Sequence, residues 1–436
     1  MHTSGNEIHE VVGIGFGPSN LSLAVALEEH RSQTTGDPIT AAFFERQPTL
    51  GWHRNMLLPS TKMQISFLKD LATFRNPASR YSFISYLHAA GRLAQFVNNQ
   101  DFFPTRQEFH DYLEWAEAGF ADRVSYSTEV TAVHLPDTVG TVDHVGVEIR
   151  DLIRGGTRLV RARNIVVSTG LVPKMPVGME RDERIWHSSQ FLEKFRKLEH
   201  NRIRRVAVVG AGQSAAEIVR FIYDSIPGAT VSAIMPSYGY SIADDTPFAN
   251  RIFDADAVDD YYNGSQRSKD SFWRYHRNTN YGVVDDEVIR DLHQRAYDDE
   301  VRGTPRLDFL NLSRVDTMKQ TGDEVRVTLH SVRDASASTH GFDLVICATG
   351  YDSMEPSRLL GDLEPLCLRD EEGRLSVQRD YSLATTPEVT CGIYLQGGTE
   401  HTHGLASSLL SNIAIRSGEI ADSIAERRVS RQYSLA

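Results

Sequence analysis

The sequence predicts an α/β protein with two Rossmann-like dinucleotide-binding domains and a small, mainly helical region that covers the substrate. Two stretches carry this prediction, VVGIGFGPSN at residues 11–20 and VAVVGAGQSAAE at residues 206–217. Each is a short apolar strand that leads into a glycine-rich turn and then a helix. Glycines let such a turn approach a pyrophosphate, which lies against the N–H groups and the positive end of the helix. Two copies about 195 residues apart indicate two dinucleotides, one of which passes electrons to the other.

Length, charge and cysteine content narrow the class of protein. A chain of 436 residues exceeds one core of usual size, which predicts two or three domains. Its net charge of -12 argues against nucleic acid or an anionic membrane as the main partner. No apolar run approaches the ~20 residues of a membrane span, and the N-terminus lacks a signal-peptide pattern. Cys347, Cys367 and Cys391 form no CxxC pair, which fits a reducing cytoplasm and excludes the redox disulfide of a flavoprotein disulfide reductase.

The first glycine turn departs from the usual fingerprint. It reads Gly13-x-Gly15-x-Gly17-Pro18, with proline where GxGxxG has its third glycine. Residues 9–14 before it are expected to form a strand, and proline suits the first turn of the helix that follows. The next strand, AAFFE, ends in Glu45, whose carboxylate can accept hydrogen bonds from an adenosine ribose. The alternative for this side chain is a solvated surface glutamate.

The segment at residues 51–104 is irregular and rich in aromatic and amide residues, which is unsuited to a plain helix or strand. Such a segment can wrap a flat, apolar ring. Helical spacing resumes at Arg106, where Phe109, Tyr112 and Trp115 share one side and are expected to be core. Several short strands follow at residues 123–169.

The second glycine turn has the pattern GxGxxA, formed by Gly210, Gly212 and Ala215. The strand after it, ATVSAIMPS, ends without an acidic residue. This absence removes a preference for an unphosphorylated ribose and favours NADPH over NADH. No arginine stands at this strand end to hold a 2′-phosphate, and Pro236 lies close to its expected place.

Residues 240–308 are polar, acidic and aromatic, and are expected to form helices and loops over the active site. Their carboxylates fit a solvated helical face better than catalytic pairs. An apolar strand within residues 342–351 and a strand, glycine turn and helix near the C-terminus return the chain to the first domain. His401 and His403 have metal-like spacing but no third ligand nearby, so no metal site is expected.

Eight pieces of the chain resemble the N-hydroxylating flavoprotein monooxygenases, the ornithine and lysine hydroxylases of siderophore and related pathways. They are GIGFGPSNL, GWHRNM, MQISFLKDL with RNP, GAGQSAAE, DDTPFANRIF, NTNY, ATGYD and HTHGL. The likeness spans roughly residues 8–420. It implies FAD at the first turn and NADPH at the second. The expected FAD-binding domain is then residues 1–195 together with 341–436, and the NADPH-binding domain is residues 196–340, with the covering insertion at about 240–310.

The resemblance also assigns site residues. Those expected at FAD are Gly13, Gly15, Gly17, Pro18, Glu45, Trp52, His53, Met63, Gln64 and Leu405. Those expected at NADPH are Gly210, Gly212, Gln213, Ser214 and Asn280. Those expected at the substrate are Lys69, which pairs with the α-carboxylate, Asn250, Asn280 and Ser407. Ser408 is the alternative to Ser407 for this role. A surface position for the lysine and helix-capping roles for the two asparagines are the alternatives.

The activity that the resemblance implies is oxygenation of an amine. Reduced flavin and O2 give a C4a-hydroperoxide, which the neutral side-chain amine of L-ornithine attacks to give N5-hydroxyornithine, so no side chain is needed as a nucleophile. L-lysine is the alternative substrate, because one methylene is worth only ~1–3 kcal/mol in a pocket. The DDTPFANRIF and NTNY segments look more like those of the ornithine enzymes, and Lys69 disfavours diamines. A homo-oligomer is also implied. A flavin reductase or oxidase without hydroxylation and a non-catalytic dinucleotide sensor remain as alternatives of other classes.

Overall fold

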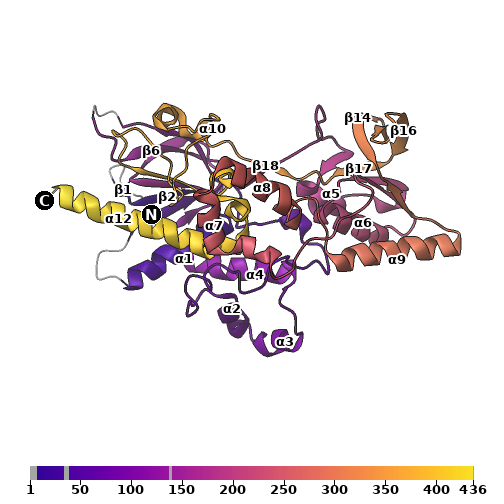
Figure 1. Cartoon of the computed structure of the whole chain (residues 1–436), viewed down its shortest axis with the longest axis horizontal. Helices are drawn as coiled ribbons and strands as arrows, with labels where there is room; N and C mark the ends of the chain where they lie inside the picture. The colour runs from indigo at the N-terminus through magenta and orange to yellow at the C-terminus, as the bar shows by residue number, and fades with distance from the viewer. Residues whose placement is uncertain (1–6, 34–38, 137–139, 436) are drawn as a thin grey trace.

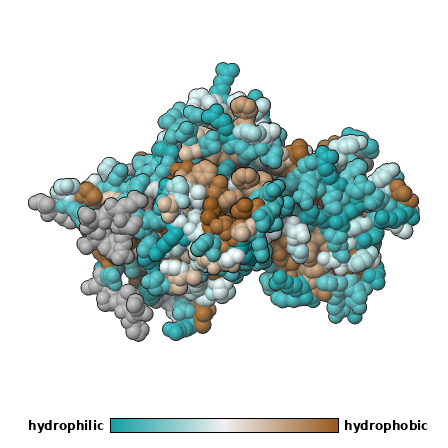
Figure 2. Space-filling view, turned by 90° about the horizontal axis from the view of Figure 1, so that it is seen from below, coloured by the Kyte–Doolittle hydropathy of each residue, from teal (hydrophilic) through white to brown (hydrophobic). Residues whose placement is uncertain are grey.

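The computed structural model describes residues 7–33, 39–136 and 140–435. The molecule is elongated, with one lobe around each of two parallel sheets and helices α7 and α8 between them (Figure 1). Seen from below, the surface is mostly hydrophilic, and hydrophobic residues gather near the middle of the view (Figure 2). None of the helices in the described part of the chain is both long and apolar enough to cross a membrane.

The first lobe is built on a five-stranded parallel sheet with the order β19-β8-β2-β3-β4. Its strands are β2 (Val11–Ile14), β3 (Ala41–Phe44), β4 (Val124–Ser125), β8 (Asn164–Val167) and β19 (Gly392–Leu395). Alternate residues of a strand point to opposite faces. Val11 and Val166 accordingly pack against helices α1 (Pro18–Gln33) and α12 (Ile413–Leu435). Val12 and Ile165 instead pack against a layer of mixed strand direction.

That mixed layer is a four-stranded sheet with the order β1-β7-β6-β5, in which β1 and β7 are parallel and the other pairs are antiparallel. Its strands are β1 (Ile8–His9), β5 (Thr128–His134), β6 (Val145–Asp151) and β7 (Thr157–Ala162). The stretch predicted as one strand, residues 9–14, is therefore divided between two sheets, because its first residue pairs with β7 and its apolar part with β3 and β8.

The second lobe is built on a parallel sheet with the order β10-β17-β11-β12-β13. Its strands are β10 (Ile185–His187), β11 (Arg205–Val209), β12 (Thr230–Ile234), β13 (Leu307–Leu310) and β17 (Leu344–Cys347). One face is covered by α5 (Phe191–Arg196), α6 (Gln213–Ser225) and α9 (Asp286–Arg302). The other face is covered by the antiparallel strands β14 (Ser313–Thr321), β15 (Glu324–Ser331) and β16 (Ala337–Phe342).

The chain passes from one lobe to the other twice, and these two crossings run side by side. Strands β9 (Leu171–Pro173) and β18 (Tyr351–Ser353) pair in antiparallel fashion. All strands of the second sheet lie between these two crossings in the sequence. Strands β10 and β17 thus belong to the second sheet, although the expected boundaries at 195/196 and 340/341 assign their residues to the first domain.

The segment at residues 51–104 contains two short helices that its irregular sequence did not predict, α2 (Phe83–Ala89) and α3 (Leu93–Asn98). Ser82 caps the first by accepting the N–H of Ser85 at 3.1 Å, and buried aromatic residues stabilise both, so tertiary packing overrides weak propensity. Helix α4 (Arg106–Glu117) follows, and its aromatic stripe is core as expected, with Phe109 and Tyr112 buried.

Of the remaining helices, α7 (Ala255–Tyr262) and α8 (Gln266–His276) lie between the lobes (Figure 1), α10 (Ser357–Leu360) packs against β5 of the first lobe, and α11 (Glu400–His403) packs against α7. The described 3-10 turns are η1 (Arg54–Met56), η2 (Ala118–Phe120), η3 (Ser188–Gln190), η4 (His200–Arg202), η5 (Ala249–Phe253), η6 (Arg277–Thr279), η7 (Gly361–Leu366), η8 (Leu405–Ser408) and η9 (Leu410–Asn412).

Candidate active site

The first glycine turn joins β2 to α1 and is shaped for a dinucleotide. Gly15 has a φ of 84°, and a Cβ at this position would lie 2.5 Å from the carbonyl oxygen of Ser168, so only glycine fits. At Gly17 a Cβ would meet nothing within 4 Å, which leaves the N-terminus of α1 open at Pro18. A hollow at the carboxyl ends of β8 and β19 adjoins the turn. It is lined by Val167, Thr169, Gly170, Gln396, Gly397 and Gly398, among others, at the sheet edge where α/β proteins bind nucleotides.

Two further residues predicted for FAD support this turn. Gly13 lies against the ring of Phe43, which leaves no space for a Cβ. The two carboxylate oxygens of Glu45 accept the backbone N–H groups of Phe16 and Gln47, each at 2.8 Å. A carboxylate has about four lone-pair sites, so Glu45 keeps the capacity to accept a ribose hydroxyl while it fixes the turn.

The second glycine turn repeats this design between β11 and α6. Gly210 has a φ of 146°, and a Cβ there would clash with the carbonyl oxygen of Ala348. Gly212 is the N-cap of α6, so Gln213 and Ser214 form the first turn of the helix, which carries no acidic residue. The helix N-terminus can therefore receive an anion. Both turns fit dinucleotides.

Aromatic side chains line the junction between the lobes. The rings of Trp52 and His53 lie 4.5 Å apart, and His53 is 6.5 Å from the ring of Tyr351 in β18. His53 has a left-handed φ of 49°. The protein packed around His53 lowers its pKa, and the charge of Arg106 lowers it further. The residue is nevertheless exposed to solvent. Met63, also predicted for FAD, is buried nearby in the aromatic core.

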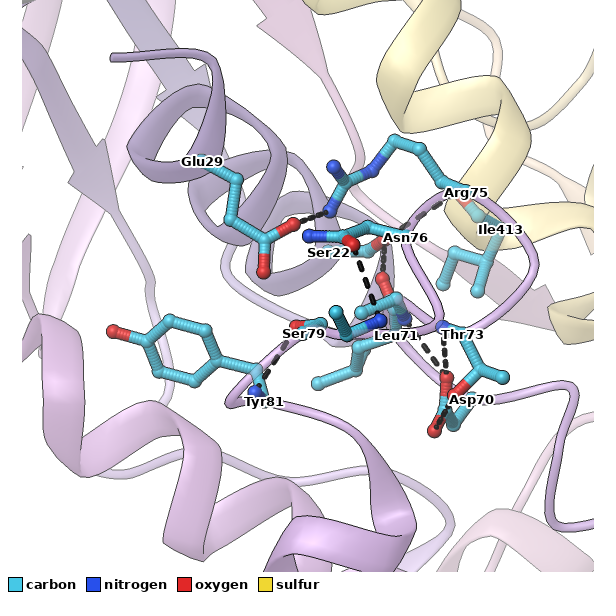
Figure 3. Close-up of polar contacts among 12 residues, drawn as sticks. Ser22, Glu29, Asp70, Leu71, Thr73, Arg75, Asn76, Ser79, Tyr81 and Ile413 are labelled. Carbon is cyan, nitrogen blue, oxygen red and sulfur yellow. Dashed lines mark hydrogen bonds and ion pairs between the residues drawn. The ribbon is translucent and has the colours of Figure 1, made fainter. Parts of the chain in front are cut away.

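The segment that follows Lys69 is rigidly anchored (Figure 3). Asp70, which is 2% exposed, accepts the N–H groups of Ala72, Thr73 and Phe83 at 2.9, 2.6 and 2.7 Å. The hydroxyl of Ser22 in α1 donates to the carbonyl oxygen of Leu71 at 2.8 Å. These bonds fix the backbone from which the lysine projects.

Lys69 points toward the region predicted to cover the substrate. Its Nζ lies 5.3 Å from the centroid of the Phe253 ring in η5. Burial lowers the pKa of Lys69, and the nearby Asp254 carboxylate offsets part of this shift. Turn η5 also carries Asn250, whose Nδ2 donates to the carbonyl oxygen of Asp245 at 2.6 Å. Asn250 thus bonds to local backbone, but it is not the N-cap of η5, which is Phe248.

Turn η5 packs against η8, which carries the other residues predicted near the substrate and FAD. Ser407 is 1% exposed, and Leu405 beside it is equally buried. In the described part of the molecule, the hydroxyls of Ser407 and Ser408 have no hydrogen-bond partner. A buried hydroxyl without a partner is costly in a folded protein. The structure thus brings Lys69, the turn that carries Asn250 and Ser407 into one region.

Asn280 lies at the end of η6, and its N–H points to the carbonyl oxygen of Arg277 at 3.5 Å. The next residue, Tyr281, donates its hydroxyl to Glu400 at the start of α11. This bond connects the covering region to the C-terminal tail. The described contacts of Asn280 itself do not reach Lys69.

A polar network at the lobe junction joins two predicted residues through partners that the sequence analysis missed. Gln64 donates to Asp285 at 3.0 Å, and Gln213 donates to the same carboxylate at 2.8 Å. Gln213 also donates to Glu217 at 3.0 Å, and Glu217 is paired with Arg106. Burial raises the pKa of Asp285. Asp285 belongs to the acidic stretch whose carboxylates were expected to be solvated. The only sequence signal that sets it apart from the other acids of that stretch is the pair of valines just before it.

The two histidines with metal-like spacing bond to the backbone. His401 Nε2 lies 3.0 Å from the carbonyl oxygen of Leu375, and His403 Nε2 lies 3.1 Å from that of Arg379. His403 also stacks on Tyr381 with a centroid distance of 4.1 Å. Both rings thus have structural partners.

Comparison with known proteins agrees with this geometry. The L-lysine 6-monooxygenase/L-ornithine 5-monooxygenase family model matches residues 7–353. The L-ornithine N(5)-monooxygenase of Burkholderia cepacia is 40% identical over 405 residues, 91% of this chain and 90% of that protein. The enzyme of the same name from Pseudomonas aeruginosa is 36% identical over 425 residues, 96% of this chain and 94% of that protein.

A solved structure gives the same result for the three-dimensional fold. The ornithine N-hydroxylase of Kutzneria sp. 744, in a complex with reduced FAD, NADP+ and L-ornithine, superposes with a TM-score of 0.93. It is 61% identical, and the match covers 97% of this chain and all of that one. By the family model and these relatives, the chain belongs to the L-lysine 6-monooxygenase/L-ornithine 5-monooxygenase family.

Proposed function

We propose that the protein catalyses the FAD- and NADPH-dependent N-hydroxylation of the side-chain amine of L-ornithine with O2, giving N5-hydroxyornithine for siderophore or related biosynthesis. The observation that carries the proposal is the convergence of Lys69, η5 and η8 beside the first glycine turn. A cation placed there suits the α-carboxylate of an amino acid. The Burkholderia and Kutzneria relatives are both named for ornithine, which supports this substrate over lysine.

Bound FAD, reduced by NADPH, supplies the activated oxygen, and the protein's own residues provide binding and shielding. Lys69 pairs with the substrate carboxylate, while Asn250, Asn280 and Ser407 orient the rest of the amino acid. The residues at 240–310 cover the site and exclude bulk water. A terminal amine with an ordinary pKa of ~10.4 loses its proton more easily in such a poorly solvated place.

We assign the FAD-binding domain to the two segments outside the paired crossings β9 and β18, and the NADPH-binding domain to the segment between them. Gly13, Gly15, Gly17 and Pro18 receive the FAD diphosphate, and Gly210, Gly212, Gln213 and Ser214 receive that of NADPH. The three buried, free cysteines fit a reducing cytoplasm. We also propose a homo-oligomer, which sedimentation of the purified chain would test.

A product assay tests the function. The purified chain with FAD, NADPH and O2 is given L-ornithine, L-lysine and putrescine side by side. We expect hydroxylated product from ornithine, with NADPH consumption coupled to it. Faster hydroxylation of lysine would move the protein to the lysine enzymes. Hydrogen peroxide without hydroxylamine from any of the three amines would favour a flavin oxidase and overturn the proposal.

A further inference from the structure

A buried arginine, Arg416, lies in the first turn of α12 and has no role in the site described above. It is 2% exposed. Its guanidinium donates to three neutral acceptors. Nε points to Oε1 of Gln396 at 3.4 Å, Nη2 to Oγ of Ser19 at 3.2 Å, and Nη1 to the carbonyl oxygen of Ser407.

Within the described ranges Arg416 has no acidic side chain at ion-pair distance, although the charge of Glu419 acts on it from further away. Glu419, one turn further along α12, is held at two points by Arg379, with both distances at 2.9 Å. An arginine stays protonated in proteins, so a full positive charge is buried among neutral groups.

Two helix N-termini add to this positive charge. Ser19 is the second residue of α1, and Arg416 is the fourth of α12. Arg416 donates to Ser19, and the hydroxyl of Ser22 in the second turn of α1 reaches the carbonyl oxygen of Ile413 at 3.4 Å, so the N-terminal ends of the two helices lie side by side. Neither first turn contains an acidic residue. Each helix N-terminus carries about half a positive charge. No acidic side chain of either turn balances it, and the nearby carboxylate of Glu45 accepts the N–H of Phe16 just before α1.

Such an arrangement is costly for the protein alone. A buried charge without a counter-ion costs several kcal/mol even after relaxation. Burial lowers the pKa of Arg416, which means that the surrounding protein disfavours the charged form of the guanidinium. An anion bound beside the first turn of α1 removes this cost. The open glycine turn at Gly15 and Gly17 directly precedes that helix, and the diphosphate of FAD carries two negative charges.

We propose that Arg416 is the charge partner of FAD, a cation that destabilises the flavin-free protein and is compensated by the cofactor's negative charge. The inference rests on the FAD binding proposed above. The charge of Arg416 acts on the FAD diphosphate across the first turn of α1, so the guanidinium needs no direct contact with the cofactor. Because the same guanidinium holds the carbonyl of Ser407 and the amide of Gln396, it also connects the cofactor turn to the substrate side.

The test combines affinity with stability. Full-length Arg416→Met, Arg416→Lys and wild-type chains are stripped of flavin, titrated with FAD by fluorescence, and melted with and without FAD. We expect Arg416→Met to bind FAD about tenfold more weakly or worse, the equivalent of about 1.4 kcal/mol. Without FAD, this variant should melt at the same or a higher temperature than wild type. Arg416→Lys, which keeps the charge, should bind FAD more tightly than Arg416→Met.

The matched control is Arg427→Met, on the same helix, where the guanidinium lies over the ring of Tyr394. It should leave FAD affinity unchanged. Equal FAD affinity of Arg416→Met and wild type would overturn the inference alone. The inference would also be overturned if Arg416→Lys and Arg416→Met bound FAD equally weakly and both melted below flavin-free wild type. The shape of the side chain, and not its charge, would then matter. A wild-type chain that binds no FAD would overturn the proposed function together with this inference.

Discussion

Arg106 and Glu217 form a two-point ion pair across the two lobes of the molecule. Nη1 lies 2.9 Å from Oε2, and Nη2 lies 2.9 Å from Oε1. The side chains are 11% and 1% exposed. Arg106 begins α4 in the first lobe and also donates to the carbonyl oxygen of Met56 at 2.8 Å, whereas Glu217 lies in α6 of the second. One side-chain pair thus connects the two nucleotide-binding units.

Breaking this pair from one side is expected to destabilise the protein strongly. Arg106→Met leaves the buried Glu217 without a counter-charge, with only the amide of Gln213 still donating to it, which costs about 3–5 kcal/mol. The double variant Arg106→Met/Glu217→Met should recover much of this loss, because no buried charge remains. Urea unfolding of the four proteins of the cycle measures the coupling. As a control, Arg290→Met, which removes an exposed pair with Asp286 on α9, should cost less than about 1 kcal/mol. A similarly small loss for Arg106→Met would contradict the prediction.

Lys69→Ala should weaken substrate binding without stopping flavin reduction. The variant loses the cation for the α-carboxylate, so the KM for ornithine should rise at least about tenfold, or 1.4 kcal/mol. NADPH oxidation in the absence of ornithine should stay largely intact. Lys62→Ala, in the same segment but paired with Asp101 at 3.0 Å, is the control and should keep the wild-type KM. Equal loss of both activities in Lys69→Ala would indicate a structural role.

Gly404→Ala should loosen the cover over the site. Gly404 has a φ of 72°, and a Cβ there would lie 3.0 Å from the ring of Tyr261 in α7. Gly373→Ala is the control, because its φ is 78° but its Cβ would meet nothing within 4 Å. Gly404 has a ψ of -165°, a conformation open almost only to glycine, so Gly404→Ala also costs about 1–3 kcal/mol in backbone strain. Gly373→Ala costs about 1–2 kcal/mol for its positive φ. Only Gly404→Ala should raise the ratio of hydrogen peroxide to hydroxyornithine, and equal ratios in the two variants would count against a covering role for α7.

His403 should make the protein sensitive to acid. Burial lowers its pKa to about 4 from 6.5, so the unfolded chain binds a proton that the folded chain excludes. Its contribution to stability is complete above pH 6.5 and is lost as the pH falls toward 4. His403→Gln should flatten the fall in unfolding free energy by up to about 1.4 kcal/mol per pH unit. His88→Gln, at an exposed position in α2, should not. An unchanged slope in His403→Gln would refute the assignment.

The rate of hydroxylation should rise with pH, because the ornithine amine must lose its proton. We expect kcat to increase between about pH 6 and 9, below the free amine's pKa of ~10.4. Burial lowers the pKa of Lys69, so its charge is lost earlier than that of a solvated lysine, and the KM for ornithine should rise at the alkaline end. Product formation at saturating and limiting ornithine separates the two effects. A flat kcat would exclude amine deprotonation as a controlling step.

The sequence by itself determined the two nucleotide-binding turns and the family. Gly15 and Gly210 are required by backbone conformation and by close approach of one neighbouring carbonyl, and such local demands leave a readable pattern. The order of the motifs was likewise enough to point to an N-hydroxylase. Family membership is confirmed by the comparisons, whereas the individual substrate residues remain predictions.

Only the tertiary structure decided which distant residues share the site. Arg106 and Glu217 are 111 positions apart, and Ser19 and Arg416 are 397 apart, so no spacing rule could pair them. The assignment of β10 and β17 to the second sheet is likewise decided by pairing between strands that are far apart in the sequence. A charged residue in a sequence looks the same whether it will be solvated or buried. Its partners, and hence its energy, are set only when long-range packing removes it from water.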